Sequence, residues 1–256
     1  MAQYKGYFLK NKFLIDKNDL KDNSGRKFLL VCLLSLFINL KFLIMDSISR
    51  ALLSIKAVKL SPDAPFTWAS GWKSPIYCNN RKLLAYPLKR RIVASRLISL
   101  VKEFGDNIDV ILGVATGAIS WGTLVADELN LPCGYIRSEK KDHGLKVQIE
   151  GFEPNQLKGK RVVIVEDLIS TGGSSLKAVE AARGAGAEIV GMAAIFTYGF
   201  PQATEAFAKA GVELKTAANY ASLLEAALDV GLVKESDLPW LSEWRESPET
   251  WGQHQN

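Results

Sequence analysis

The chain has 256 residues, of which 48% are hydrophobic and 23% are charged. These numbers suit one sizeable core in an ordinary globular protein. Three cysteines without a CxxC pair and only two histidines argue against a disulfide framework and a zinc or histidine-rich metal site. The net charge of +5 resides in residues 1–45, which hold eight Lys and Arg against three Asp, while the rest of the chain holds 24 of each sign. A body with balanced charge disfavours nucleic-acid binding.

Residues 28–44 form an apolar run that follows a basic stretch. A spanning helix needs about 20 apolar residues, and Asn39 and Lys41 interrupt this run. No small-residue cleavage site follows, as a secretory signal would require. Three interpretations stay open: upstream sequence translated ahead of a start at Met45, which we favour, a membrane anchor, or an added helix. We therefore expect 1–45 to be a leader outside the native fold and 46–256 to form one domain, whose charge balance and helix patterning suit a cytoplasmic protein.

The body opens with a helical pattern over residues 47–60, a Pro-, Gly- and Trp-rich stretch of loops and short strands over 61–82, and a helix over 87–104. Short apolar runs then alternate with helical patterns. Strands are predicted at residues 110–114, 133–136, 161–165, 188–196 and 212–214, and helices at 119–129, 173–183, 203–210 and 219–230. The polar residues 137–158 are predicted to form a long loop.

Strands that alternate with helices predict an α/β fold with a parallel sheet covered on both faces. In such sheets ligands bind at the carboxyl ends of the strands, where the strand order reverses. The residues that follow Val114 and those that follow Val165 are therefore expected at one site.

The segment 162–174 is the most informative in the chain. An apolar strand runs into two adjacent acids, then a Ser-Thr-Gly-Gly loop, then a helix. Loop amides and a helix N-terminus bind phosphate, and the glycines allow close approach of the backbone. Adjacent carboxylates at a strand end are well placed to accept hydrogen bonds from two vicinal hydroxyls of a ribose. The segment matches neither the GxxxxGK[ST] phosphate loop nor the GxGxxG motif of dinucleotide-binding folds. The alternative without a ligand is a strand end followed by a capped helix.

This segment resembles the phosphoribosyl pyrophosphate (PRPP) signature of the type I phosphoribosyltransferases. The resemblance implies that family's fold, a mostly parallel central sheet flanked by helices, with a small N-terminal hood or hairpin region. It also implies that the two acids hold the ribose hydroxyls and that the loop cradles the 5′-phosphate. The PRPP-binding residues implied here are Glu166, Asp167, Leu168, Ile169, Ser170, Thr171, Gly172, Gly173 and Ser174.

Residues 66–81 look like the F-T-x-x-S-G-x-x-S-P-x-Y signature of the orotate phosphoribosyltransferases. By this resemblance the hairpin lies over orotate and ribose, and Lys73, Tyr77 and Ser170 are implied to bind orotate. Many relatives carry lysine where this chain has Ala69, so Lys73 is the candidate cation. The alternative is a surface hairpin with exposed tryptophans.

Two further segments are similar to that family. Residues 113–119 match the loop that contacts pyrophosphate through its backbone, which implicates Thr116 and Gly117 in PRPP binding. Residues 137–144 are similar to the R-x-x-x-K-D-H-G lid, which implies pyrophosphate contacts from Arg137, Lys141 and His143. Lid residues in the family reach the neighbouring subunit, so a homodimer is implied.

The resemblance implies Mg²⁺-dependent transfer of ribose 5-phosphate from PRPP to orotate, giving orotidine 5′-phosphate and pyrophosphate in pyrimidine biosynthesis. Lys141, His143 and Asp167 are the candidate catalytic residues. Magnesium is expected on the substrate, with no dedicated protein ligand, and neither nucleic acid nor a membrane is expected as a partner. Two alternatives stay open: a phosphoribosyltransferase for another base, and a regulator that senses PRPP.

Overall fold

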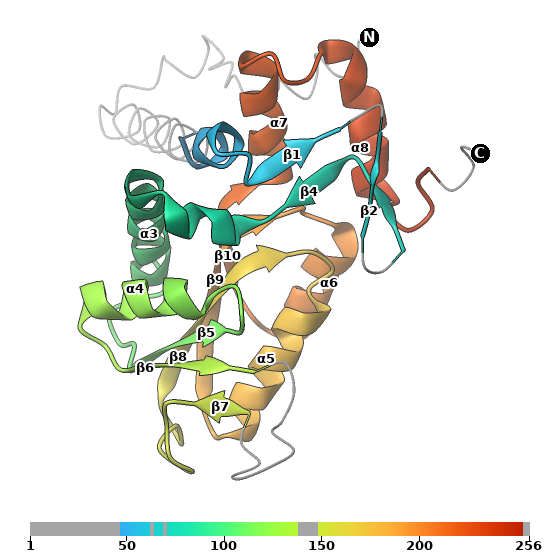
Figure 1. Ribbon diagram of the computed structural model, residues 1–256. Coiled ribbons are helices and arrows are strands. Elements are labelled where there is room, and N and C mark those ends of the chain that lie inside the picture. The colour runs from blue at the N-terminus through green and yellow to red at the C-terminus, as the bar shows by residue number, and fades with distance from the viewer. Residues whose placement is uncertain (1–46, 62–63, 69–70, 138–147, 253–256) are drawn as a thin grey trace, which may run out of the picture. The chain divides into compact units, whose positions relative to one another are not determined.

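The computed structural model describes residues 47–61, 64–68, 71–137 and 148–252 (Figure 1). The predicted leader, residues 1–45, lies outside the described residues, so its role stays a prediction. Lys141 and His143 lie outside them too. Within the described part of the chain, no helix is long and apolar enough to cross a membrane.

A six-stranded sheet with the order β10-β9-β8-β5-β6-β7 forms the centre of the fold (Figure 1). Its strands are β5 (Val110–Val114), β6 (Cys133–Ile136), β7 (Ile149–Glu150), β8 (Arg161–Ile169), β9 (Glu188–Thr197) and β10 (Leu214–Asn219). All neighbouring pairs are parallel except β6–β7, which is antiparallel. The prediction of an α/β fold with a mostly parallel sheet is confirmed.

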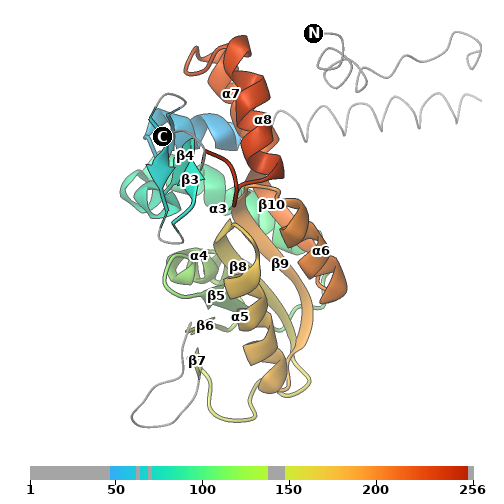
Figure 2. The same ribbon diagram turned by 90° about the vertical axis from the view of Figure 1, so that its right-hand side faces the viewer.

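Helices cover both faces of the sheet (Figures 1 and 2). From residue 87 on, the α-helices are α3 (Pro87–Lys102), α4 (Ile119–Leu129), α5 (Gly173–Gly184), α6 (Pro201–Lys209), α7 (Tyr220–Asp229) and α8 (Leu238–Glu246). Helices α3 and α4 pack on one face, and α5 and α6 on the other. A Cβ on Gly122 of α4 would lie 3.1 Å from the Cα of Gly113 in β5, so this pair of glycines brings the helix close to the strand.

The N-terminal part differs from the predicted single helix over 47–60. Residues 47–54 are helical, Lys56 adopts a left-handed conformation (φ 53), and β1 (Val58–Leu60) pairs antiparallel with β4 (Ile76–Cys78). The apolar spacing that suggested a longer helix is also the alternation of a half-buried strand, and pairing with β4 selects the strand.

The hood consists of this helix, the β1–β4 pair, the hairpin of β2 (Phe66–Thr67) and β3 (Lys73–Ser74), and the 3₁₀ helix η2 (Asn80–Ala85). Its tryptophans are not an exposed surface feature. The Trp68 ring lies tilted against Tyr198 and meets Trp244 of α8 edge-on, with ring centroids 5.1 and 5.7 Å away. Its Nε1 donates to the carbonyl of Ile76. Aromatic packing of this kind ties the hood to the C-terminal helix.

Three strands differ from their predicted bounds, β9 by the single residue Thr197, and the predicted loop 137–158 contains β7. Strand β8 continues through the paired acids to Ile169, because it stays in register with β9 as far as the pair Ile169–Thr197. Strand β10 begins at Leu214 rather than at residue 212 and extends to Asn219, whose side chain caps α7 by accepting a hydrogen bond from the amide of Ser222.

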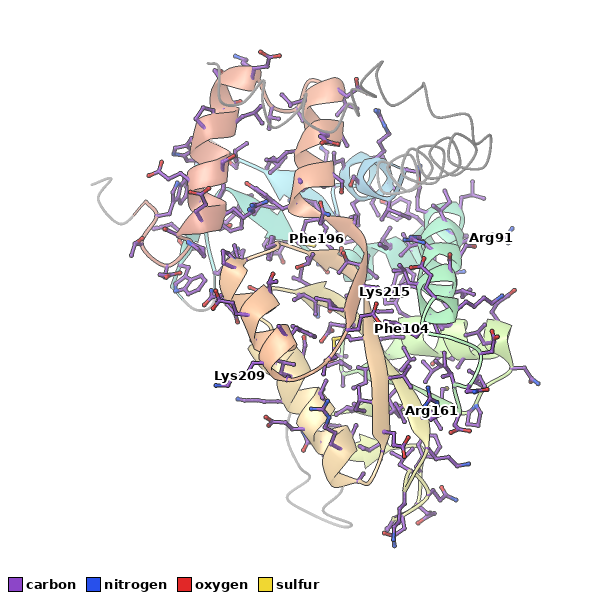
Figure 3. All side chains as sticks on the ribbon, turned by 180° about the vertical axis from the view of Figure 1, so that it is seen from behind. Arg91, Phe104, Arg161, Phe196, Lys209 and Lys215 are labelled. Atoms are coloured by element: carbon purple, nitrogen blue, oxygen red, sulfur yellow. The ribbon has the colours of Figure 1, made fainter. Side chains whose placement is uncertain are left out.

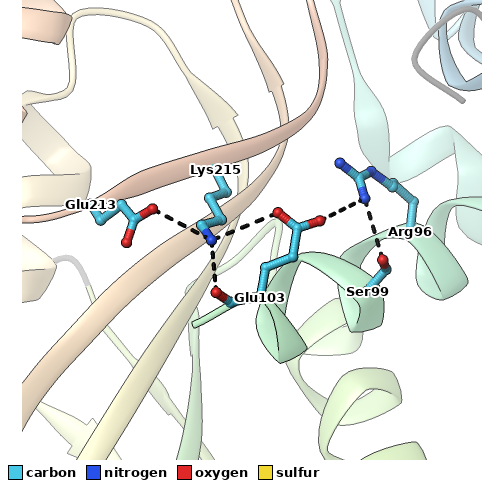
Figure 4. Close-up of polar contacts among 5 residues, drawn as sticks. All are labelled: Arg96, Ser99, Glu103, Glu213 and Lys215. Carbon is cyan, nitrogen blue, oxygen red and sulfur yellow. Dashed lines mark hydrogen bonds and ion pairs between the residues drawn. The ribbon is translucent and has the colours of Figure 1, made fainter. Parts of the chain in front are cut away.

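Charged side chains join the end of α3 to β10 (Figure 4). Lys215 Nζ donates to the Glu103 carbonyl (2.9 Å) and lies over the ring of Phe104, at 4.6 Å from its centroid (Figure 3). Glu103 also accepts a 3.0 Å hydrogen bond from the buried Arg96. These contacts hold the end of α3 against the edge strand β10. They lie near the amino end of β10, away from the carboxyl ends of the strands.

Candidate functional site

The carboxyl ends of β5 and β8 meet where the strand order reverses. From β5 the chain crosses to β6 on one side and later to β8 on the other. Pairing between β5 and β8 ends at Gly113 and Val165. The residues after Val114 and after Val165 therefore emerge at the same edge, as the sequence predicts.

Gly117 and Asp167 are in direct contact at this edge. A Cβ built on Gly117 would overlap the Asp167 carboxylate, approaching Oδ1 to 2.7 Å and the other carboxylate atoms more closely. The loop after β5 thus needs glycine at this position if the carboxylate is to keep its place. Thr116 in the same loop is exposed.

The first of the paired acids, Glu166, is buried, with 5% of its surface exposed. Its Oε1 accepts from the Asp167 amide (2.9 Å) and its Oε2 accepts from Ser175 Oγ on α5 (3.0 Å). Burial, and secondarily the charge of Asp167, raises the pKa of Glu166 to about 8. Burial therefore favours the neutral form of this carboxyl group.

The second acid, Asp167, is less buried than Glu166. Burial raises its pKa, while the hydrogen bond with Glu166 and the positive charge of Arg81 act in the opposite direction. Its carbonyl oxygen accepts a 2.5 Å hydrogen bond from Nδ2 of Asn80, which is buried in the hood. Arg81 and Asn80 are site neighbours that the sequence reasoning did not single out, because no local pattern links η2 to β8.

The loop after the acids has the form of an anion site. Gly172 has φ 84 and lies against the ring of Phe207, from which a Cβ would be 3.0 Å away. It is the N-cap of α5, and a glycine has no side chain with which to cap the first amides of the helix. Those amides point to the loop, where the helix dipole favours an anion.

The other predicted phosphate-loop residues differ in exposure. Gly173 and Ser174 are exposed, and Ser170 and Thr171 are half-buried. Leu168 is half-buried and Ile169 is buried in the core, so these two contribute backbone rather than side-chain groups to the loop.

The residues predicted to bind orotate lie in two elements. Ser170 is in the loop after β8. Lys73 Nζ donates to Thr67 Oγ1 across the β2–β3 hairpin (3.0 Å), and its carbonyl accepts from Trp244 Nε1. Tyr77 is 41% exposed and lies 5.8 Å from the ring of Phe66. The structure thus places Lys73 and Tyr77 on the hood.

Arg137 stands at the base of the segment 138–147. Its amide donates to the Gln148 carbonyl (2.8 Å), and Gln148 Nε2 donates back to the Arg137 carbonyl (2.9 Å). This reciprocal pair closes the base of the segment that carries Lys141 and His143. The Arg137 guanidinium lies 3.5 Å from Glu150.

Comparison with known proteins shows which protein family this chain is similar to. The phosphoribosyl transferase domain family matches residues 80–222. The chain is 57% identical over 204 residues to the orotate phosphoribosyltransferase of Phocaeicola vulgatus, which covers 79% of this chain and 94% of that protein.

Solved structures of orotate phosphoribosyltransferases are similar in fold to this chain. The orotate phosphoribosyltransferase of Aeropyrum pernix superposes with a TM-score of 0.63 at 31% identity, covering 73% of this chain and 99% of that one. The Mycobacterium tuberculosis enzyme in complex with PRPP superposes with a TM-score of 0.53 at 25% identity, covering 70% of this chain and 98% of that one.

Proposed function

On the premise that this chain belongs to the orotate phosphoribosyltransferases of the phosphoribosyl transferase family, we propose that PRPP binds at the joined ends of β5 and β8. The activity is transfer of ribose 5-phosphate from PRPP to orotate, giving orotidine 5′-phosphate and pyrophosphate in pyrimidine biosynthesis. The observation that carries the proposed site is the contact of Gly117 with Asp167, beside an N-terminus of α5 capped only by glycine.

The ribose 5-phosphate end of PRPP is assigned to β8 and α5. Asp167 accepts hydrogen bonds from the ribose hydroxyls, with Glu166 behind it. Ser170, Thr171 and Ser174, together with the amides of Gly172 and Gly173, bind the 5′-phosphate. Support comes from the partial exposure of Asp167 and from the exposure of Gly173 and Ser174 in the loop beside it.

The pyrophosphate end is assigned to the loop after β5 and to the segment closed by Arg137. Breaking the bond at the anomeric carbon leaves a cationic sugar and a departing polyanion, so catalysis requires positive groups at the pyrophosphate. Lys141 and His143 stabilise or protonate it, and the Thr116 and Gly117 amides donate to it. Closure of the segment over the substrates would also keep water from the reactive carbon.

Orotate is assigned to the space between the hood and the loop after β8. Ser170, Lys73 and Tyr77 would hold the base so that its nitrogen faces the anomeric carbon. The anchoring of the hood through Trp68 and Trp244 supports this, because it keeps the hairpin at the carboxyl end of the sheet.

Magnesium suits this donor set. Carboxylate, hydroxyl and phosphate oxygens are the ligands that Mg²⁺ prefers. Both oxygens of Glu166 already accept hydrogen bonds, so we assign the metal to the pyrophosphate and ribose oxygens of PRPP rather than to dedicated protein ligands. When bound, Mg²⁺ would offset the charge of the leaving group.

A homodimer and a cytoplasmic location complete the proposal. Leu88 is 75% exposed and Ile92 is 42% exposed one turn later on α3, and a second copy would shelter them. Light scattering should give a molar mass of two chains. If α3 is part of the dimer interface, Leu88→Glu should shift the measured mass toward that of one chain. The free thiols Cys78 and Cys133 suit a reducing compartment.

The full chain should consume orotate, followed by ultraviolet absorbance, only with PRPP and Mg²⁺ present. Lys141→Ala and Asp167→Asn should abolish most turnover, while Lys209→Ala and Asp106→Asn, the same changes at exposed positions, should not. Retained PRPP binding without orotate turnover would instead favour another base or a PRPP sensor, which a panel of bases would separate.

A further inference from the structure

Two consecutive hydrogen bonds through Asn80 join the hood to the paired acids. Asn80 is 2% exposed at the start of η2. Its Nδ2 donates to the Asp167 carbonyl oxygen at 2.5 Å, and its Oδ1 accepts from Cys78 Sγ at 3.2 Å. The two bonds thus link the last residue of β4 to the second acid of β8.

The peptide groups of Asp167 need partners because β5 stops before reaching them. Pairing between β5 and β8 ends at Val165. Beyond it, the Asp167 amide donates to the Glu166 carboxylate, and the Asp167 carbonyl accepts from Asn80. A buried carbonyl left without a donor is costly, so side chains here replace a strand.

The orientation of the Asn80 amide is determined from both sides. The Asp167 carbonyl can only accept, so Nδ2 must face it. The Cys78 thiol donates to the opposite oxygen, and burial raises the pKa of Cys78, which keeps the thiol protonated. A carboxylate at position 80 would instead present an oxygen to the carbonyl.

We propose that Asn80 is a positioning residue that holds the Asp167 backbone, and through it the carboxylate, in place for the ribose of PRPP, with Cys78 orienting its amide. Asn80 acts through Asp167 and does not touch the reacting atoms. The inference rests on the proposed function of Asp167. The position of Asp167 would then depend on how the hood packs on the sheet, because β4 and η2 belong to the hood.

The test compares full-length variants for PRPP affinity and for kcat and KM. Asn80→Leu keeps the branched shape of the side chain and removes both hydrogen bonds, and should lower kcat/KM for PRPP by about 10- to 100-fold, as expected for a misplaced binding group. Asn155→Asp, an asparagine-to-aspartate change at an exposed site, should leave kcat/KM within about twofold of the unchanged protein.

Two graded variants separate positioning from a loss of folding. Asn80→Asp donates only while its carboxyl is protonated, so its activity relative to the unchanged protein should fall as the pH rises. Its contacts are Cys78 of β4 and the Asp167 carbonyl of β8, and Glu166 and Arg81 act on the Asp167 carboxyl beside it. Dividing by the activity of the unchanged protein removes the pH dependence that these groups have in both proteins. Cys78→Ser retains a donor and should exceed Cys78→Ala in kcat/KM.

Several outcomes would overturn the inference. Asn80→Leu could keep its kcat/KM within twofold, Asn80→Asp could lose activity equally at every pH, or the two Cys78 variants could be equal. Each presupposes that the unchanged protein turns orotate over. If that protein fails to do so, the proposed function itself fails, and the two failures are thereby distinguished.

Discussion

Replacing Gly117 with alanine puts a methyl group into the space of the Asp167 carboxylate. The new Cβ would lie 2.7 Å from Oδ1 and closer to the rest of the carboxylate. Carbon and oxygen atoms in ordinary contact are about 3.5 Å apart, so this oxygen must move by roughly 0.8 Å and the rest of the carboxylate by more. The carboxylate can turn away more easily than the β5–α4 backbone can shift, because Gly113 and Gly122 pack the helix tightly on the strand.

A displacement of this size is enough to break a hydrogen bond from a ribose hydroxyl to the carboxylate. Hydrogen bonds to charged groups contribute about 1.5–3 kcal/mol, which corresponds to roughly 10- to 150-fold in PRPP affinity. The fold itself should lose little stability, since the moved group is a side chain at the edge of the sheet.

Isothermal titration with PRPP, and kcat/KM with orotate, would measure the effect. Gly184→Ala is the matched control, because that glycine is exposed near the end of α5 with nothing within 4 Å of an added Cβ. If Gly117 acts through Asp167, Gly117→Ala should add little in an Asp167→Ala background, where the carboxylate is gone. Unchanged PRPP affinity of Gly117→Ala, or full additivity of the two changes, would refute the reasoning.

Three further outcomes are expected. Because the folded pKa of Glu166 is raised, its protonated form stabilises the ligand-free protein at low pH, and this contribution is lost as the pH rises from about 4.5 to about 8. Glu166→Gln should remove that part of the pH dependence of the melting temperature, and an unchanged dependence would contradict the assignment. Glu103→Gln weakens the pairing of buried Arg96 and should cost about 1–3 kcal/mol in urea denaturation, whereas Glu213→Gln, at a 62% exposed partner of the same network, should cost under about 1 kcal/mol. Trp244→Ala should cost about 3–5 kcal/mol by emptying the aromatic cluster, and a loss under about 1 kcal/mol would show that the hood is anchored otherwise.

Local patterns were sufficient where the element was decided by its own residues. The runs 110–114 and 133–136 are short apolar stretches bounded by polar or turn residues, and the structure has strands at these bounds. Helix 119–129 was predicted to the residue for the same reason, since its apolar period ends at Asn130, which takes a left-handed conformation. Residues 58–60 were assigned wrongly because their spacing fits a helix and a strand alike.

The sequence by itself determined the chemistry of the site: two acids after an apolar strand, a glycine-rich loop, and a helix start that together suit a ribose phosphate. Its family resemblance also indicated the base. Only the tertiary structure decided how those groups are held. Asn80 and Asp167 are 87 positions apart, and Trp244 and Lys73 are 171 apart. No periodicity or motif encodes such pairs, because they arise from the way the hood and α8 pack at the end of the sheet.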